Sequence, residues 1–228
     1  GAFVSGYLQK SLGLLRGFDV YNEDNFYSWE VFTRGEKFLR NPKNRKKFLL
    51  FLHFMDVHAP YGDTFFGNVF VNKSYDGVLK AVKEAPLLPR YVEAVRREMK
   101  EEDIEFVRAK YDGDVLHADS RLRDFFTKLE EMGVLNNTII VIFSDHGEEL
   151  GEHGRFGHGY IHECQLHSFL LIKLPGMVEG KRVKEVVELR SIGPTILELL
   201  GYHFKYWEGK SLVPVSYTHL RAHETEAD

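Results

Sequence analysis

Three short apolar runs, separated by segments with helical patterning, constrain the fold of this chain more than any other feature. The runs occupy residues 48–56, 138–143 and 169–174, and Pro175 and Gly176 stop the last one. The nearly unbroken apolarity of the first run predicts a strand that is buried on both faces, which is typical of parallel sheets. Strands that alternate with helices predict an α/β fold, with a mixed, mostly parallel central sheet flanked by helices.

Two segments carry the pattern of helices. Over residues 103–132, apolar side chains recur in steps of three and four, and the pattern ends before Gly133. Over residues 193–200, Pro194 lies in the first turn and Gly201 follows the last, which is typical of helix ends. We expect the first of these helices to cover the sheet.

The length of 228 residues is enough for one sizeable core. No repeat or low-complexity linker divides the chain, so we expect one domain over residues 1–215. Residues 62–89 are polar and contain Gly, Asn and Pro, which predicts an excursion on the surface. Residues 216–228 are polar and have no periodicity, and we expect them to be a non-native tail.

Composition and charge exclude several classes of protein. Hydrophobic residues make up 43% and charged residues 28%, with a net charge of −4, which excludes a disordered chain and argues against a nucleic-acid partner. The longest apolar run is far shorter than the ~20 residues of a membrane-spanning helix, so we expect no transmembrane segment. The single cysteine, Cys164, excludes an internal disulfide framework and a zinc cluster built from cysteines, and leaves the cellular compartment open. We expect Cys164 to be a half-buried structural residue.

Carboxylate and imidazole side chains follow two of the predicted strands directly. Asp56 and His58 come after the first strand, and Asp145 and His146 come after the second. Ligands collect at the carboxyl ends of strands in open α/β sheets, so both pairs are site candidates. Asp145 and His146 could both reach one cation, and an oxygen plus a nitrogen ligand suits Zn or Mn and is tolerable for Ca. The alternative is that the second pair caps the following turn.

Histidines are concentrated after the second strand. Five of the eleven fall between positions 146 and 167, where imidazoles could bind a metal or transfer protons near neutral pH. Glycines in this segment would let His158 fold back toward the metal, although a surface loop without function is the alternative. His162, Glu163 and His167 resemble a metalloprotease motif, but a spacing of five instead of four residues puts the histidines on different faces of a helix.

Seven short segments along the chain form a pattern through their order and spacing. They are GFD (17–19), LHFMDVHAPY (52–61), YDGDVLHADSRL (111–122), SDHGEELGEHG (144–154), KLPG (173–176), SIGPTILELLG (191–201) and EGKSLVP (208–214). Their order and spacing resemble the sulfatases, a family within the alkaline phosphatase superfamily, over nearly the whole chain up to about Pro214. The resemblance implies the sandwich fold of that superfamily, here incomplete because no Cys-x-Pro-x-Arg nucleophile motif is present.

The resemblance also implies a function and roles for particular residues. The reaction would be metal-dependent hydrolysis of sulfate esters by the longer protein, with this portion inactive alone. Asp145 and His146 would bind one divalent ion, which is calcium in the family, with zinc or manganese as alternatives. His58 and His158 would contact the oxygens of the ester and act in catalysis, His58 as a binder of those oxygens or as the acid for the leaving group. The formylglycine nucleophile would lie outside this chain.

One departure from the family pattern leaves alternatives open. His158 and Gly159 stand where many sulfatases have Lys-Gly, and phosphoethanolamine transferases of the same superfamily have His-Gly at similar spacing. A phosphoester hydrolase or a phosphoethanolamine-type transferase on the same fold is therefore the first alternative. A non-catalytic homologue that binds metal is the second.

Overall fold

The computed structural model describes residues 1–5, 7–25, 27–177, 179–202 and 208–214. The chain forms two compact units. The first unit contains Gly1–Ile140, His146–His167 and Leu174–Gly176, and the second contains Val141–Asp145, Ser168–Lys173 and the chain from Met177 onward. The expected tail, 216–228, lies outside the described residues, and the extent of a domain over 1–215 stays a prediction.

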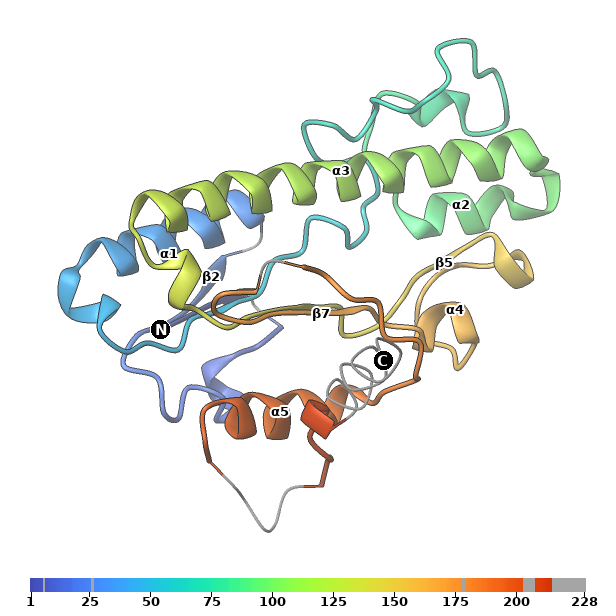
Figure 1. Ribbon diagram of the computed structural model, residues 1–228. Coiled ribbons are helices and arrows are strands. Elements are labelled where there is room, and N and C mark those ends of the chain that lie inside the picture. Colours follow the sequence, from blue (N-terminus) through green and yellow to red (C-terminus); the bar gives the residue numbers. More distant parts are fainter. Residues whose placement is uncertain (6, 26, 178, 203–207, 215–228) are drawn as a thin grey trace. The chain divides into compact units, whose positions relative to one another are not determined.

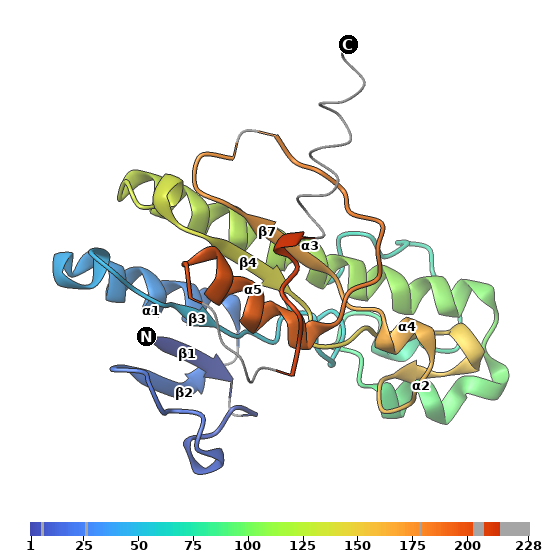
Figure 2. The ribbon, with the colours of Figure 1, turned by 60° about the horizontal axis from the view of Figure 1, so that its bottom comes forward.

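A parallel sheet organises the beginning of the first unit. Strand β1 (Ala2–Ser5) lies between β2 (Tyr21–Asn25) and β3 (Phe51–Leu52), and both pairings are parallel (Figure 2). All four residues of β1 are buried. Parallel pairing between segments about 20 and 50 residues apart confirms the predicted α/β class.

The predicted strand over 48–56 is wrong in length and in burial. Only Phe51 and Leu52 form ladder pairs, and both are half-buried. After these two residues the chain runs to Asp56, whose carboxylate lies at the start of the earlier helix α1 (Ser28–Arg40) and accepts hydrogen bonds from the backbone N–H and the hydroxyl of Ser28, both at 2.6 Å. A carboxylate at this position stabilises the first turn of a helix.

The helices of the first unit are α1 (Ser28–Arg40), α2 (Pro89–Val95), α3 (Glu101–Glu131) and the single turn α4 (Glu163–Leu166). Helix α3 confirms the predicted helix over 103–132. It lies beside α1 (Figure 1), and its residues Phe125 and Leu129 pack with Phe3 of β1 and Phe32 of α1 in one apolar cluster. The expectation that this helix covers the sheet is therefore confirmed.

Short 3₁₀ turns connect these elements at Lys10–Leu12, Pro42–Arg45, Lys80–Val82, Arg96–Glu98, Leu135–Asn137, Glu152–Gly154 and Leu189–Ser191.

The polar segment 62–89 lies largely on the surface, as predicted, but it also supplies part of a second apolar cluster. Tyr75, Leu79 and Leu87 are at most 7% exposed and pack against residues of α3. The ring of Tyr75 stacks on Phe106 with 4.2 Å between centroids. These apolar residues occur at irregular spacing within a polar sequence. Their burial therefore cannot be predicted from a strand or helix period.

Two strands form a hairpin that carries the histidine-rich segment. Strands β5 (Glu149–Leu150) and β6 (Phe156–Gly157) pair antiparallel and are joined by the 3₁₀ turn Glu152–Gly154. The predicted glycine-rich loop is therefore ordered into a turn between short strands.

The second unit contains the remaining predicted elements. Strands β4 (Ile140–Phe143) and β7 (Leu170–Lys173) form a two-stranded sheet, and α5 (Ile192–Leu199) follows. These bounds agree with the predictions over 138–143, 169–174 and 193–200 to within two residues. Among the described residues, no helix has the length and apolarity needed to cross a bilayer.

Gly113 lies within α3 where residues 66–67 pass closest to it. A Cβ atom at this position would lie 2.4 Å from the carbonyl oxygen of Phe66 and 2.9 Å from Cα of Gly67. Replacing Gly by Ala normally stabilises a helix interior by about 1 kcal/mol. Because backbone atoms cannot give way easily, we predict that Gly113→Ala instead lowers the free energy of unfolding by about 1–3 kcal/mol, measured by urea denaturation.

The matched control is Gly180→Ala, where nothing lies within 4 Å of the added Cβ. We expect this variant to change the free energy of unfolding by less than about 0.5 kcal/mol. A Gly113→Ala variant as stable as the parent protein would contradict the close packing of 66–67 on α3.

Candidate active site

His58 follows the sheet in a tight turn. Its backbone N–H donates to the carbonyl of Met55, and its ring Nδ1 lies 2.7 Å from the carbonyl oxygen of Ala59. A carbonyl can only accept, so Nδ1 carries the proton in this contact. In the neutral ring, Nε2 therefore holds the lone pair that can meet a ligand.

His146 has the same arrangement. Its Nδ1 lies 2.7 Å from the carbonyl oxygen of Gly147 and donates to it. Histidines that bind metals commonly donate their other ring N–H to a backbone carbonyl, because this fixes the tautomer and the ring orientation. The local structure at His146 therefore fits a metal ligand through Nε2.

His158 brings the three imidazoles together. It directly follows β6, and its ring centroid lies 4.3 Å from that of His146 and 5.2 Å from that of His58. Its Nδ1 donates to Oε2 of Glu148 at 3.0 Å. The structure thus gathers three of the four predicted site residues within the first unit.

Glu148 is a member of this cluster that the sequence analysis did not select. Its side chain is 7% exposed and accepts a 2.6 Å hydrogen bond from the hydroxyl of Tyr61. Ligand atoms of His146, Glu148 and His158 all lie within 4.8 Å of one another, so these residues could hold a divalent cation. The segment SDHGEELGEHG (144–154) contains Glu148 and Glu149 side by side, and the sequence alone does not indicate which of them faces the histidines.

The hydroxyl of Tyr61 is a permanent donor to Glu148. Tyr61 is fully buried, and burial followed by the nearby Glu148 carboxylate raises its pKa far above the ordinary value. Burial also raises the pKa of the neighbouring Tyr111 to about 12. Both phenols therefore remain protonated near neutral pH, and Tyr61 keeps Glu148 in place.

Gly147 permits a close contact beneath the site. Its N–H donates to the carbonyl of Gln165 at 2.7 Å, and a Cβ atom here would lie 2.1 Å from the carbonyl oxygen of Cys164. A side chain at position 147 is therefore excluded. Glycine allows the segment between His146 and Glu148 to pack directly on α4.

Asp145 is exposed and is described with the second unit. Its backbone carbonyl accepts a hydrogen bond from the hydroxyl of Ser168 at 3.3 Å. Binding of one cation by Asp145 together with His146 stays a prediction.

Asp56 has a structural position, although it comes two residues before His58. It is 2% exposed, accepts both hydrogen bonds from Ser28, and lies 3.6 Å from Nε2 of His117. Burial raises its pKa, against the opposing effect of the hydrogen bonds from Ser28. The Asp56 carboxylate thus binds the first turn of α1 and is not part of the group formed by His58, His146 and His158.

Comparisons with known proteins agree with the motif analysis. The family model described as sulfatase matches residues 8–202. An arylsulfatase of Clostridium perfringens is 29% identical over 187 residues, which is 77% of this chain, and arylsulfatase K of Bos taurus is 29% identical over 82% of it. The chain spans 39% of the length of each of these relatives.

The architecture also matches that of a solved structure. The phosphonate monoester hydrolase of Agrobacterium radiobacter superposes with a TM-score of 0.62 at 21% identity, covering 82% of this chain and 41% of that protein. This match shows that the chain shares the fold of part of that hydrolase, which agrees with the expected α/β class.

Removing the Tyr61 hydroxyl tests how Glu148 is held. We predict that Tyr61→Phe lowers the free energy of unfolding by about 1.5–3 kcal/mol, because it leaves a shielded carboxylate without one of its two donors. Urea denaturation measures the change. Tyr111→Phe is the matched control: its hydroxyl makes no hydrogen bond within the described part of the chain, so we expect a change below about 0.5 kcal/mol. Equal effects of the two variants would contradict a specific role for the bond to Glu148.

Proposed function

Since this chain belongs to the sulfatase family, we propose that the intact protein hydrolyses sulfate esters with the help of one divalent metal ion. The observation that carries the proposal is the group of three imidazoles, His58, His146 and His158, whose His158 is hydrogen-bonded to the shielded carboxylate of Glu148. The similarity to two arylsulfatases supports sulfate as the group that is cleaved.

The metal would be held by Asp145 and His146, with further ligands from the rest of the longer protein. When bound, the ion would neutralise charge on the non-bridging oxygens of the ester. The family favours calcium, whereas an imidazole ligand suits zinc or manganese better. His146 is prepared for this role because its Nδ1 proton is already donated to the carbonyl of Gly147.

His58 and His158 would act on the ester itself. Each ring donates its Nδ1 proton to a protein acceptor, so a cationic ring, with Nε2 protonated as well, would donate from Nε2 to the ester oxygens or give that proton to the departing alkoxide. Glu148 fixes the ring of His158 through the hydrogen bond to its Nδ1. In our proposal, Glu148 is thus a positioning residue.

The nucleophile would come from another part of the longer protein. No Cys-x-Pro-x-Arg motif occurs in these 228 residues, and in sulfatases that motif provides the formylglycine. We therefore propose that this portion supplies metal ligands and imidazoles to a site that it does not complete alone.

A second candidate is a phosphoester hydrolase or phosphoethanolamine-type transferase. The observation that favours it is His158 followed by Gly159, in place of the Lys-Gly of many sulfatases. Both candidates need a negatively charged ester, and neither needs a nucleic-acid partner.

Loss of either imidazole tests the proposed roles. In the intact protein, we expect His58→Ala and His158→Ala each to lower kcat/KM for p-nitrophenyl sulfate by about 10²- to 10⁴-fold, because each removes an oxygen ligand or a proton donor. Treatment with a chelator should abolish turnover, and added divalent metal should restore it. Steady-state kinetics at neutral pH measure these effects.

The control is His167→Ala, since this histidine is in the same segment but its side chain is 77% exposed. We expect it to leave kcat/KM unchanged. Full activity in His58→Ala and His158→Ala would refute both catalytic roles. A parent protein that cleaves bis-p-nitrophenyl phosphate and not the sulfate would favour the second candidate.

A further inference from the structure

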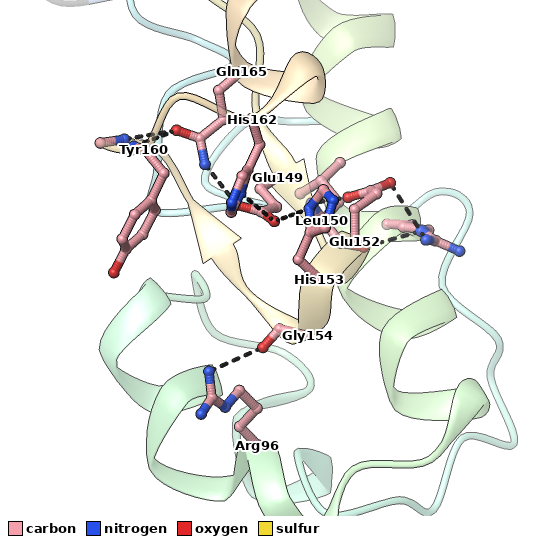
Figure 3. Close-up of polar contacts among 11 residues, drawn as sticks. Arg96, Glu149, Leu150, Glu152, His153, Gly154, Tyr160, His162 and Gln165 are labelled. Carbon is pink, nitrogen blue, oxygen red and sulfur yellow. Dashed lines mark hydrogen bonds and ion pairs between the residues drawn. The ribbon is translucent and has the colours of Figure 1, made fainter.

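A second group of metal-binding side chains surrounds Glu149, the residue after Glu148. Glu149 is fully buried, and three side chains point at its carboxylate (Figure 3). Nδ1 of His153 lies 2.8 Å from Oε1, Nδ1 of His162 lies 3.2 Å from both oxygens, and the amide of Gln165 donates to Oε2 at 2.6 Å. A buried carboxylate is costly unless it is hydrogen-bonded, and two of the three partners here are imidazoles, a side chain that commonly binds metals.

Cys164 adds sulfur to this group. Its Sγ, a carboxylate oxygen of Glu149 and a ring nitrogen of His153 all lie within 4.8 Å of one another. His162 is not one of these three, but its ring centroid lies 4.2 Å from that of His153 and its Nδ1 lies 3.2 Å from both oxygens of Glu149, so a shift of this ring would add a fourth ligand. One carboxylate, two imidazoles and one thiol form a mixed set that zinc accepts in tetrahedral sites. The single cysteine excludes a cluster of cysteines but not a mixed site.

The backbone holds His153 in a fixed place. His153 has φ of 55°, in the left-handed region that residues other than glycine seldom adopt. The turn around it is held from outside: Arg96 donates to the carbonyl of Gly154 at 3.1 Å (Figure 3). Arg108 donates to the carbonyl of Leu150 at 3.0 Å. The two arginines therefore hold the turn that carries His153, and the turn places the imidazole beside Glu149.

This cluster is separate from the candidate active site. Glu148 immediately precedes β5, whereas Glu149 is its first residue, and the two adjacent side chains have different partners. Glu148 contacts Tyr61 and His158, whereas Glu149 contacts His153, His162 and Gln165.

We propose that Glu149, His153, His162 and Cys164 form a structural zinc site that fastens the β5–β6 hairpin to α4. Binding would release the thiol proton to solvent, and each neutral imidazole would carry its proton on Nε2 in place of Nδ1. The proposal does not depend on the sulfatase activity, because none of its four ligands belongs to the proposed catalytic group.

Cobalt is the first probe, because a thiolate ligand gives Co²⁺ a charge-transfer absorption that oxygen and nitrogen ligands do not. We expect the full 228-residue chain, freed of metal, to develop this absorption on titration with Co²⁺ and to lose it when Zn²⁺ displaces the cobalt. Cys164→Ser should abolish the absorption, and His153→Ala should weaken Co²⁺ binding at least about tenfold.

Two control variants separate the sites. His167→Ala removes an exposed imidazole from the same segment, and His146→Ala removes a proposed ligand of the catalytic metal. Both should retain the thiolate absorption. Absence of the absorption in the parent chain, or its persistence in Cys164→Ser, would overturn the proposal.

X-ray absorption of the zinc-loaded parent chain provides a test that needs no variant. We expect one sulfur neighbour at about 2.3 Å from zinc, together with nitrogen and oxygen neighbours at about 2.0–2.2 Å. A shell of nitrogen and oxygen alone would overturn the site even if the chain binds zinc elsewhere. These results do not involve turnover, so failure of the zinc site and failure of the proposed sulfatase activity are distinguishable.

Discussion

Two adjacent carboxylates, those of Glu148 and Glu149, are largely or fully shielded from water, and each must be matched by hydrogen-bond donors. Glu148 obtains a phenol and an imidazole, and Glu149 obtains two imidazoles and an amide. Burial alone would raise the pKa of Glu149, but the hydrogen bonds from its three partners lower it overall. Both carboxylates thus hold histidines in place, Glu148 just before β5 and Glu149 within it.

The apolar core supports this hairpin through a few specific contacts. Tyr61 pairs with Leu87 through two backbone hydrogen bonds, packs in the cluster beneath α3, and donates its hydroxyl to Glu148. On the other side of the hairpin, Arg108 of α3 donates to the carbonyl of Leu150. The segment 62–89 therefore matters to the chemistry: by completing the cluster around Tyr61, it fixes the carboxylate that positions His158.

The sequence predicted the elements whose patterns are local. Helix α3 and the strands β4 and β7 were recognisable because their apolar periods lie within single segments. Strand β2 (Tyr21–Asn25, YNEDN) was not, because it has no strand pattern of its own and exists by pairing with β1. The run over 48–56 was overextended because nothing in its apolarity indicates that Asp56 is drawn to the start of α1.

The site was predictable to a similar degree. Histidines after strand ends pointed to His58, His146 and His158, which the fold brings together. The roles of Glu148 and Tyr61 depend on a contact between residues 87 positions apart, and such a contact leaves no local signal. The cluster around Glu149 was hidden for the same reason: the sequence shows a histidine-rich segment, but only the fold shows which imidazoles share a buried carboxylate.

The central claim is that Glu148 acts through His158. A double-mutant cycle on kcat/KM of the intact protein tests it most directly, comparing Glu148→Gln, His158→Ala and the variant with both changes. If Glu148 serves to position His158, the double variant should be no slower than His158→Ala alone. Losses that multiply in the double variant would mean that the two residues act independently, and would contradict the account.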